Sequence, residues 1–292
     1  MFPPLFFQHQ CSGDMLPFAF FLSTITMRNM NMIIIQARMG ATRLPGKILM
    51  SLAGKPMLWH VVVRAAAAKH ADKAVVATTT NSEDDATETF CQKNGFLVSR
   101  GSAHDVLDRY YLAAREHGAD QTVMLARVTG DCPLVDPDAI DMNFDAYRNG
   151  GYDYVSTARP GPSNWPRGLD CEVFSSAALE KAYQNATEEF EHEHVTPYLW
   201  QNKNNEFKIG PTVVAPPEYA RDYRLTVDYP EDLEVMEKIF TKFGAGGKLI
   251  SVPEVLRWLD EHPEIVAINK DCEAQHRARE AQSLGEDQAS RR

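Results

Sequence analysis

Cysteine is sparse and scattered in this sequence, and the spacings of metal-binding cysteines do not occur. The five cysteines lie at positions 11, 91, 132, 171 and 272, with no CxxC pair among them. An odd number without regular spacing argues against a disulfide framework and against a cysteine-ligated zinc site. We therefore expect reduced thiols and a cytoplasmic protein.

The sequence also lacks an excess of basic residues. It has 30 Lys and Arg against 40 Asp and Glu, which gives a formal net charge of −10. Proteins that bind nucleic acid or anionic lipid nonspecifically generally present a basic field. We therefore expect no nucleic-acid partner and no membrane partner, and any anionic substrate must meet cations gathered at one place.

The apolar run from Met15 to Leu22 is too short to span a bilayer, which needs about 20 residues. No Lys or Arg occurs before Arg28, so the positive region that opens a secretory signal is absent. We interpret residues 1–31 as an extension outside the core that begins at an upstream start codon; a signal or anchor is the alternative. At the other end, the polar residues 271–292 are expected to form a flexible tail.

From Met32 onward, short β-rich runs alternate with amphipathic segments, the pattern of a mostly parallel sheet flanked by helices. This predicts an α/β domain over 32–270, with a smaller elaboration over about 151–222, where Pro and Gly interrupt the pattern. The expected strands are 33–35, 74–78, 96–99, 122–128, 171–174, 207–210 and 223–227, and the expected helices are 56–70, 83–94, 103–117, 176–185, 190–201 and 230–243.

The loop that follows the first expected strand concentrates positive charge. It contains Arg38, Arg43 and Lys47 together with Gly40 and Gly46. Arginine forks match phosphate oxygens, lysine adds a compact charge, and glycine lets backbone N–H groups approach an anion. The loop therefore predicts a clamp for a triphosphate, and a solvated surface loop is the alternative.

This loop is not the phosphate loop of ATPases. That motif needs four residues between its glycines and a Ser or Thr after the lysine. Here five residues separate Gly40 from Gly46, and Ile48 follows Lys47. The GxGxxG spacing of dinucleotide-binding folds is absent as well.

Two distant aspartates end expected strands, Asp131 and Asp228. The carboxyl ends of parallel strands meet at one edge of a sheet, where ligands bind. Carboxylate oxygens are ligands that Mg²⁺ prefers, and a bound ion keeps positions for phosphate and water. We therefore expect Asp131 and Asp228 to hold Mg²⁺; a turn or helix-cap role, for Asp228 in particular, is the alternative.

Other polar motifs carry weaker predictions. Asp136-Pro137-Asp138 fits a helix N-cap followed by proline, although an Asp-x-Asp pair is also what a metal-dependent glycosyltransferase uses. His192 and His194 lack the four-residue spacing of a helical zinc site, so a surface or substrate-facing role is expected. No nucleophile elbow occurs, and we expect direct transfer without a covalent intermediate.

Several blocks of the sequence resemble the cytidylyltransferase superfamily, which includes the enzymes that activate 3-deoxy-manno-octulosonate and acylneuraminate. The resemblance is strongest to its spore-coat polysaccharide biosynthesis branch. It implies a Rossmann-like nucleotidyltransferase fold of the GT-A-like kind. The blocks that carry it are 33–40, 43–47, 127–134, 167–174, 193–197 and 224–228, in this order along the chain.

The resemblance also implies roles for individual residues. The cations of the loop would grip the CTP phosphates and, with Asp131, form the catalytic set. Thr129-Gly130-Asp131 replaces the usual Gln-Gly-Asp of the octulosonate enzymes, which leaves the acceptor open. The implied nucleotide-binding residues are Ala37, Arg38, Gly40, Arg43, Lys47, Arg100, Gly101 and Arg109, and the implied acceptor-binding residues are Arg167, Asp170, Glu172 and His194.

The implied activity is transfer of CMP from CTP to the anomeric hydroxyl of an acidic keto-sugar of the nonulosonic or octulosonic type. Pyrophosphate would be released, and the product would serve surface polysaccharide synthesis. A homodimer is implied by the same resemblance. Three alternatives remain: a glycosyltransferase that uses Asp136 and Asp138, a sugar-1-phosphate nucleotidyltransferase, and an inactive nucleotide-binding module.

Overall fold

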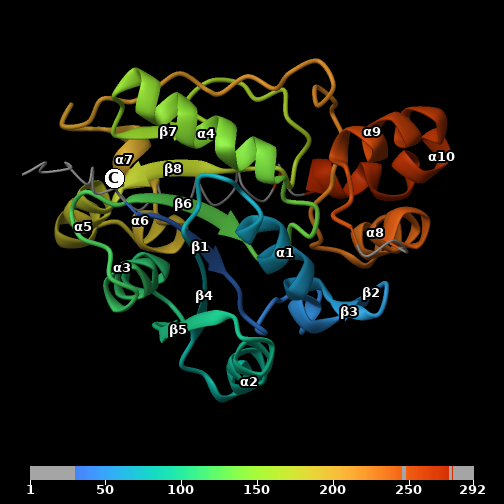
Figure 1. Cartoon of the computed structure of the whole chain (residues 1–292), viewed down its shortest axis with the longest axis horizontal. Coiled ribbons are helices and arrows are strands. Elements are labelled where there is room, and N and C mark those ends of the chain that lie inside the picture. The colour runs from blue at the N-terminus through green and yellow to red at the C-terminus, as the bar shows by residue number, and fades with distance from the viewer. Residues whose placement is uncertain (1–29, 245–247, 276–277, 279–292) are drawn as a thin grey trace, which may run out of the picture.

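The computed structural model describes residues 30–244, 248–275 and 278, and its centre is a six-stranded sheet (Figure 1). The strands lie in the order β5-β4-β1-β6-β8-β7. The first four are mutually parallel, and β8 runs antiparallel to both β6 and β7. Their bounds are β1 (Asn31–Gln36), β4 (Lys73–Thr79), β5 (Leu97–Gly101), β6 (Met124–Thr129), β7 (Tyr154–Ser156) and β8 (Glu172–Ser175).

Both faces of the sheet are covered, so the four central residues of β1, Met32 to Ile35, are all apolar rather than alternating. Ile33 and Ile35 pack on the face covered by α1 (Met57–Ala66) and α4 (Pro137–Gly150), which lie in front of the sheet in Figure 1. Met32 and Ile34 pack on the other face, against α3 (Val106–Glu116) and α5 (Ser176–Asn185). The predicted α/β fold with a mostly parallel sheet is confirmed.

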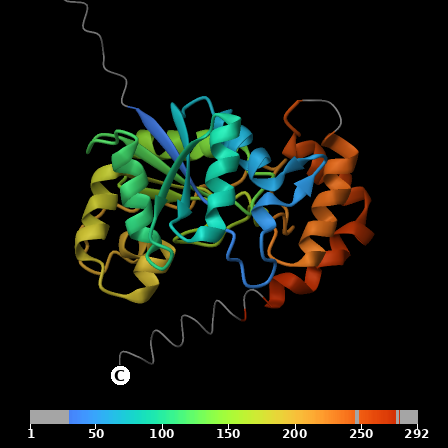
Figure 2. The ribbon, with the colours of Figure 1, turned by 90° about the horizontal axis from the view of Figure 1, so that it is seen from below.

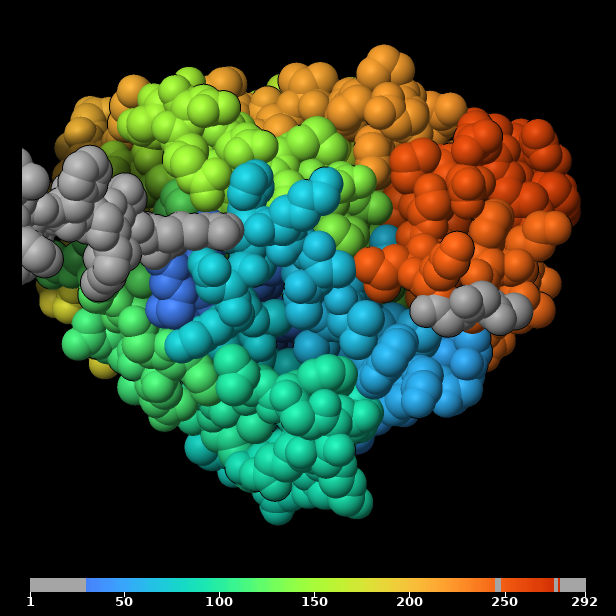
Figure 3. Space-filling model, in the orientation of Figure 1, coloured from blue at the N-terminus to red at the C-terminus, as the bar shows by residue number. Residues whose placement is uncertain are grey.

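The C-terminal helices form a separate apolar cluster at one end of the sheet (Figures 1 and 2). They pack against a hairpin of β2 (Ser51–Leu52) and β3 (Lys55–Pro56), which the sequence pattern did not indicate. The two regions form one continuous surface (Figure 3). These helices are α8 (Pro230–Phe243), α9 (Val252–Glu261) and α10 (Pro263–Val266), followed by the 3-10 helix η4 (Ala267–Asn269).

Shorter helices complete the domain. The 3-10 helices η1 (Lys47–Leu49) and η2 (Ser82–Asp84) follow β1 and β4, and α2 (Asp85–Asn94) continues from η2. The expected helix over 190–201 is instead two helices, α6 (Glu189–His194) and α7 (Pro197–Gln201). Pro197 has no N–H to donate to a carbonyl one turn earlier, so α6 cannot continue through it.

Two expected strands are not strands of the sheet. Residues 207–210 contribute only a bridge between Ile209 and Tyr154, and residues 223–227 only a bridge between Arg224 and Arg167. The second segment lacks a ladder because its N–H groups bond to separate places. Leu225 donates to the carbonyl of Arg167 at 2.7 Å, whereas Val227 donates to the carbonyl of Asp131 at 2.9 Å.

The expected terminal segments lie mostly outside the described residues. Residues 1–29 and 279–292 are not described, and β1 already begins at Asn31. Residues 271–275, expected to belong to the tail, are helical. Cys272 is buried, and the carboxylate of Glu273 pairs with Arg224 at 3.0 Å. Among the described residues, no helix has the length and apolar character needed to cross a membrane.

One fully buried carboxylate, Asp232 in the first turn of α8, joins the C-terminal helices to the 223–228 segment. It accepts hydrogen bonds from Arg224 Nε at 2.9 Å and from Asn269 Nδ2 at 2.9 Å. It also accepts from the backbone N–H groups of Asp228 and Tyr229, at 2.9 and 3.1 Å. Asp232 therefore fixes the backbone that carries Asp228.

Replacing Asp232 by Ala should destabilise the fold by roughly 3–5 kcal/mol, because it removes a fully buried partner of Arg224 and leaves the N–H groups of Asp228 and Tyr229 without their acceptor. Urea unfolding measures this change. Glu234→Ala on the same helix is the matched control, since its partner Lys238 is exposed and such a pair contributes at most about 1 kcal/mol. A loss for Asp232→Ala no larger than that of the control would contradict this account of the helix junction.

Candidate active site

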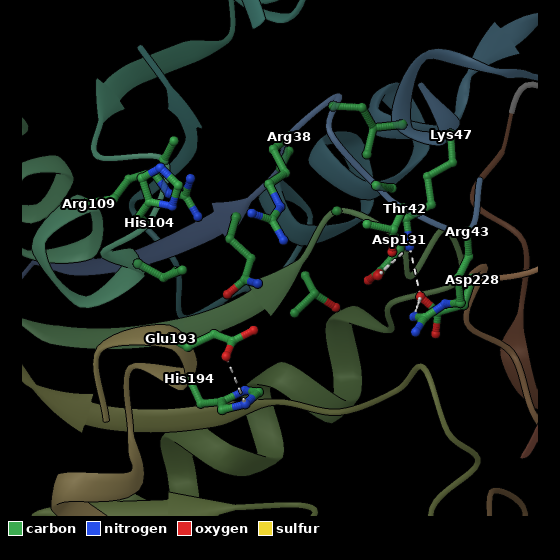
Figure 4. Close-up of a pocket in the computed structure, with 18 of the residues that line it drawn as sticks. Arg38, Thr42, Arg43, Lys47, His104, Arg109, Asp131, Glu193, His194 and Asp228 are labelled. Carbon is green, nitrogen blue, oxygen red and sulfur yellow. Dashed lines mark hydrogen bonds and ion pairs between the residues drawn. The ribbon is translucent and has the colours of Figure 1, made fainter. Parts of the chain in front are cut away.

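A cavity of about 570 Å³ opens at the carboxyl ends of β1 and β6 (Figure 4). Its walls come from five segments that lie far apart in the sequence. These are residues 36–48 at and after the end of β1, residues 103–109 around the start of α3, residues 129–131 at and after the end of β6, α6, and Asp228. The cavity lies where ligands bind in parallel sheets, beyond the strand ends.

Hydrogen bonds to Met39 hold the cationic loop in shape. The N–H of Met39 donates to Oδ1 of the buried Asp84 at 2.8 Å. The carbonyl of Met39 accepts from Ala41 and from Gly46, at 2.8 and 2.9 Å. Gly46 has φ of 72°, a left-handed conformation that glycine adopts without strain. The end of the loop therefore folds back onto Met39, and Lys47 is the first residue of η1.

Gly130 allows the loop and the end of β6 to approach closely. Its N–H donates to the carbonyl of Gln36 at 2.8 Å. A Cβ at this position would lie 2.9 Å from both the Cβ of Ala37 and the carbonyl oxygen of Gln36, closer than such atoms can approach. A side chain at residue 130 would push the metal-site candidate Asp131 away from the cationic loop.

Asp131 and Asp228 converge on one ammonium group. Lys47 Nζ lies 2.9 Å from Asp131 Oδ2 and 2.9 Å from Asp228 Oδ1, and it donates to the carbonyl of Val227 at 2.7 Å. Arg43 Nη2 donates to the same oxygen of Asp228 at 2.6 Å, and the Arg43 guanidinium lies over the ring of Tyr229. Figure 4 shows these side chains gathered at one end of the cavity.

Asp228 is available to this cluster because it does not cap α8. The N-cap of that helix is Tyr229, and Asp232 bonds back to the N–H groups at its start. Asp228 Oδ2 instead accepts from Arg224 Nη2 at 2.9 Å, so each of its two oxygens faces a cation. The helix-cap alternative for Asp228 is thus not what the structure shows.

Charge balance keeps both carboxylates ionised. Burial raises the pKa of Asp228, but the charges of Lys47 and Arg43 outweigh it, and the pKa is strongly lowered. Burial likewise raises the pKa of Asp131, and the ammonium of Lys47 again gives a net lowering. The pKa of Lys47 is raised, because its two carboxylate neighbours outweigh its burial.

The donor set fits a hard divalent cation. Asp131 and Asp228 both bring carboxylate oxygens to within 2.9 Å of Lys47 Nζ, and such oxygens are ligands that Mg²⁺ prefers. Within the described residues, no group of three or more His, Cys, Asp or Glu side chains could hold a metal. Two carboxylates leave most coordination positions to other oxygens, which suits an ion that is completed by phosphate and water.

The opposite end of the cavity has two further arginines. Arg38 is exposed and points into the cavity (Figure 4). Arg109 is buried, and its Nη1 donates to the carbonyl of Ser102 at 3.2 Å. No described residue bonds to Arg109 Nε, and burial, together with other contributions that include the charge of Arg38, lowers the pKa of Arg109. Two guanidinium groups that line one cavity favour an anionic ligand.

Helix α6 forms the third side of the cavity through Glu189, Glu193 and His194. It is fastened to α3 by His192, whose Nδ1 lies 2.8 Å from Oδ2 of Asp105. Asp105 is also the N-cap of α3. His194 packs near Phe190 and is half-buried, so its ring is presented from a fixed helix.

The family model described as cytidylyltransferase matches residues 32–262, which is most of the chain. The chain belongs to the cytidylyltransferase family. It is therefore a nucleotidyltransferase enzyme, and the resemblance seen in the sequence is confirmed.

Individual relatives agree with this family. The spore coat polysaccharide biosynthesis protein SpsF of Bacillus subtilis is 35% identical over 240 residues, covering 80% of this chain and 95% of that protein. A solved cytidylyltransferase structure from Leptospira borgpetersenii has a TM-score of 0.72 at 34% identity, covering 82% of this chain and 97% of that one. A 3-deoxy-manno-octulosonate cytidylyltransferase of Anaeromyxobacter dehalogenans is 39% identical over 128 residues, 44% of this chain and 51% of that enzyme.

In this cytidylyltransferase, most of the predicted site residues lie together, although their roles stay predictions. Gly40 is outside the cavity lining, and a Cβ there would lie 2.6 Å from Glu83 Oε1. The predicted residues that line the cavity are Ala37, Arg38, Arg43, Lys47, Arg109, Asp131, His194 and Asp228.

Arg100 and Gly101, expected near the nucleotide, also lie outside the cavity lining. Arg100 bonds to Asp85 and Glu88 at 2.7 and 2.8 Å, which ties β5 to α2. Gly101 packs directly against the backbone of Arg109, where a Cβ would come within 3.1 Å of Cα. Arg100 therefore holds α2 against β5, and Gly101 lets α3, which contributes Val106 and Arg109 to the cavity, lie close to β5.

Three of the four expected acceptor residues do not line the cavity. The backbone of Arg167 bonds to Tyr223 and Leu225, and its side chain lies 3.8 Å from Glu273. Asp170 accepts from the N–H of Gly168 at 3.1 Å, and burial raises its pKa. Glu172 is buried, and its carboxylate is occupied by neighbouring donors.

Several lining residues were not assigned from the sequence, among them Gln36, Thr42, His104 and Glu189. Gln36 ends the strand before the cationic loop and Thr42 lies within that loop, so the sequence pattern already pointed to their region. His104 follows the end of β5, the same kind of strand end that identified Asp131. Nothing in the local pattern of Glu189 distinguishes it from an ordinary first-turn acid.

The cap interpretation of Asp136 is confirmed. Its Oδ1 accepts from the N–H groups of Asp138 and Ala139, at 2.9 and 3.3 Å, and from the hydroxyl of Tyr219 at 3.2 Å. Arg64 lies 3.5 Å from Oδ2. Because these partners occupy both carboxylate oxygens, the Asp-x-Asp pair is part of the helix start and not of the cavity.

The Lys47→Met variant should change how stability depends on pH. A carboxylate with a lowered folded pKa stabilises the fold above its unfolded pKa of about 3.9, and this is lost as the pH falls through the folded pKa. Without Lys47, burial and the charge of Asp228 raise the pKa of Asp131. Asp131 of the variant therefore becomes protonated at a higher pH than Asp131 of wild type, and protonation removes the cost of its uncompensated charge. The stability deficit of the variant should therefore shrink as the pH falls from 8 to 5.

Urea unfolding in buffer with EDTA measures this deficit at each pH. Lys93→Met, an exposed lysine of α2, is the matched control, and its offset should not vary with pH. A deficit for Lys47→Met that stays constant from pH 8 to pH 5 would show that the ammonium does not control the ionisation of Asp131.

Proposed function

We propose that this enzyme transfers CMP from CTP to the anomeric hydroxyl of an acidic keto-sugar and releases pyrophosphate. The observation that carries the proposal is the convergence of Asp131 and Asp228 on the cationic loop at one end of a single cavity. A nucleoside triphosphate with a divalent cation is the ligand that needs carboxylates and loop cations side by side.

In this proposal, Asp131 and Asp228 hold Mg²⁺, which neutralises charge on the triphosphate when bound. Arg38, Arg43 and Lys47 bind phosphate oxygens. Lys47 and Arg43 balance the carboxylates in the structure, and both side chains line the cavity in which the triphosphate would bind. The aspartates and the cations thus serve one ligand.

The reaction is direct in this proposal. The acceptor hydroxyl oxygen bonds to the α-phosphorus, the bond from that phosphorus to the pyrophosphate oxygen breaks, and the hydroxyl proton leaves. Cys132 follows Asp131, but burial raises the pKa of its thiol well above the ordinary value, so it does not supply a thiolate. Positioning and electrostatic stabilisation would supply most of the rate enhancement.

The relatives support an acidic sugar as acceptor. One is named for 3-deoxy-manno-octulosonate and another for spore coat polysaccharide biosynthesis. A homodimer is proposed on the family resemblance alone, and light scattering on the purified protein would test it.

The structure does not support the metal site that the glycosyltransferase alternative requires. It needs Asp136 and Asp138 free for a metal, whereas Asp136 is occupied by the start of α4 and by Arg64. The sugar-1-phosphate nucleotidyltransferase alternative shares the triphosphate site and differs only in the acceptor. Choice of acceptor separates the two.

A pyrophosphate-release screen tests the function. We expect turnover with CTP and Mg²⁺ in the presence of 3-deoxy-manno-octulosonate or a nonulosonic acid, and little with UTP, GTP or ATP. Release with a sugar 1-phosphate and not with any keto-acid would overturn the proposed acceptor. Release of a nucleoside diphosphate from a nucleotide sugar would overturn the reaction.

Two variants sharpen the same screen. Asp131→Asn should lower kcat at least 100-fold, because it removes a metal ligand and a charge that Lys47 balances. Asp138→Asn is the matched control on the exposed start of α4 and should keep nearly the full rate. A near-normal rate for Asp131→Asn would contradict the metal assignment, and a large loss for Asp138→Asn would restore the Asp-x-Asp alternative.

A further inference from the structure

Gln36, the last residue of β1, is part of the cavity wall, and its amide has a fixed orientation. Arg127 Nη2 donates to Gln36 Oε1 at 3.1 Å. A guanidinium has donors only, so the amide oxygen must face Arg127 and the NH₂ group must face away. Within the described part of the chain, no residue bonds to that NH₂ group.

Arg127 is itself held by a buried carboxylate. It lies opposite Glu172 in the antiparallel pair of β6 and β8, and its Nη1 donates to Glu172 Oε2 at 3.0 Å. Glu172 also accepts from the hydroxyl of Tyr154 at 3.0 Å and from Thr196 Oγ1 at 3.1 and 3.2 Å. The guanidinium plane, and with it the amide of Gln36, has little freedom to turn.

The same carboxylate fixes the segment that presents His194. Val195 has φ of 71° and ψ of −55°, and the N–H of Thr196 donates to the carbonyl of His194 at 2.8 Å. These values describe a classic γ-turn, which is rare and strained, and more so at a β-branched residue. The bond from Thr196 to Glu172 and the burial of Val195 hold this turn in place.

This network lies on one side of the cavity. Gln36 bonds toward β6 and β8, whereas the buried Arg109 and the end of β5 lie on the β4 and β5 side of β1. The amide therefore belongs to the half of the cavity that contains His194 and not to the half that contains Arg109. In the proposed reaction, the first of these halves is the acceptor side.

We propose that Gln36 is a specificity-determining residue that donates a hydrogen bond from Nε2 to an oxygen of the acceptor sugar. Arg127 and Glu172 are positioning residues that hold the amide in this orientation. The inference rests on the proposed function and deepens it. It also gives Glu172 a role outside the cavity lining, where the structure places it.

Three variants test the donor. Gln36→Leu removes both polar atoms, and Gln36→Glu keeps an oxygen for Arg127 but removes the NH₂ group. Gln184→Leu on the exposed face of α5 is the matched control. KM is measured for CTP and for the acid that gives the highest rate in the wild-type screen.

Gln36→Leu and Gln36→Glu should both raise the acceptor KM, by roughly tenfold for one lost hydrogen bond, and leave the KM for CTP within about twofold. An unchanged acceptor KM in either variant, or an equal rise for CTP, would overturn the inference while the proposed function stands. Absence of turnover by wild type with every acid would overturn both.

The positioning residues need a paired variant, because Arg127→Met alone leaves a buried carboxylate without its cation and can prevent folding. Arg127→Met with Glu172→Gln removes the charges together. This pair should raise the acceptor KM as Gln36→Leu does, and adding Gln36→Leu to it should raise it little further, since all three act through one donor. Fully additive effects, or equal losses for CTP, would overturn the positioning role.

Discussion

The structure depends on the placement of one ammonium group between two carboxylates. Asp131 and Asp228 come from distant parts of the chain, and a buried anion beside a partly buried one is strongly repelled without a cation between them. Lys47 compensates both, and the loop that carries it is folded back on itself at Met39 and Gly46. The shape of the cationic loop and the positions of the two carboxylates therefore depend on each other. Together they form one end of the cavity.

Other buried charges serve the same end. Asp232 and Arg224 fix the chain around Asp228, and Asp84 fixes the loop around Met39. A second network, of Glu172 with Arg127, lies under the other half of the cavity and reaches Gln36. The cations of the loop thus line the cavity, and the ion pairs of Arg224 and Arg127 hold the segments around it.

Much of this arrangement follows from the sequence, and the reason is the parallel sheet. Because parallel strands end at one edge, the pattern alone brings Asp131 to the loop after β1, and the Asp-Pro pair predicts the cap at Asp136. The features that the sequence pattern does not predict depend on hydrogen bonds between distant segments. Residues 223–227 have the composition of a strand, yet their N–H groups bond to two separate segments. Glu172 reads as a strand-end acid, and only its three buried donors show that it lies outside the cavity lining.

The most direct test of the central claim is the linkage between a divalent cation and CTP. Mn²⁺ affinity is measured by electron paramagnetic resonance with and without CTP, in wild type and in the Asp131→Asn, Asp228→Asn double variant. If the aspartates and the loop cations form one site, CTP strengthens Mn²⁺ binding to wild type, and by reciprocity Mn²⁺ strengthens CTP binding. The double variant should lose this coupling. The same coupling in both proteins would contradict the account.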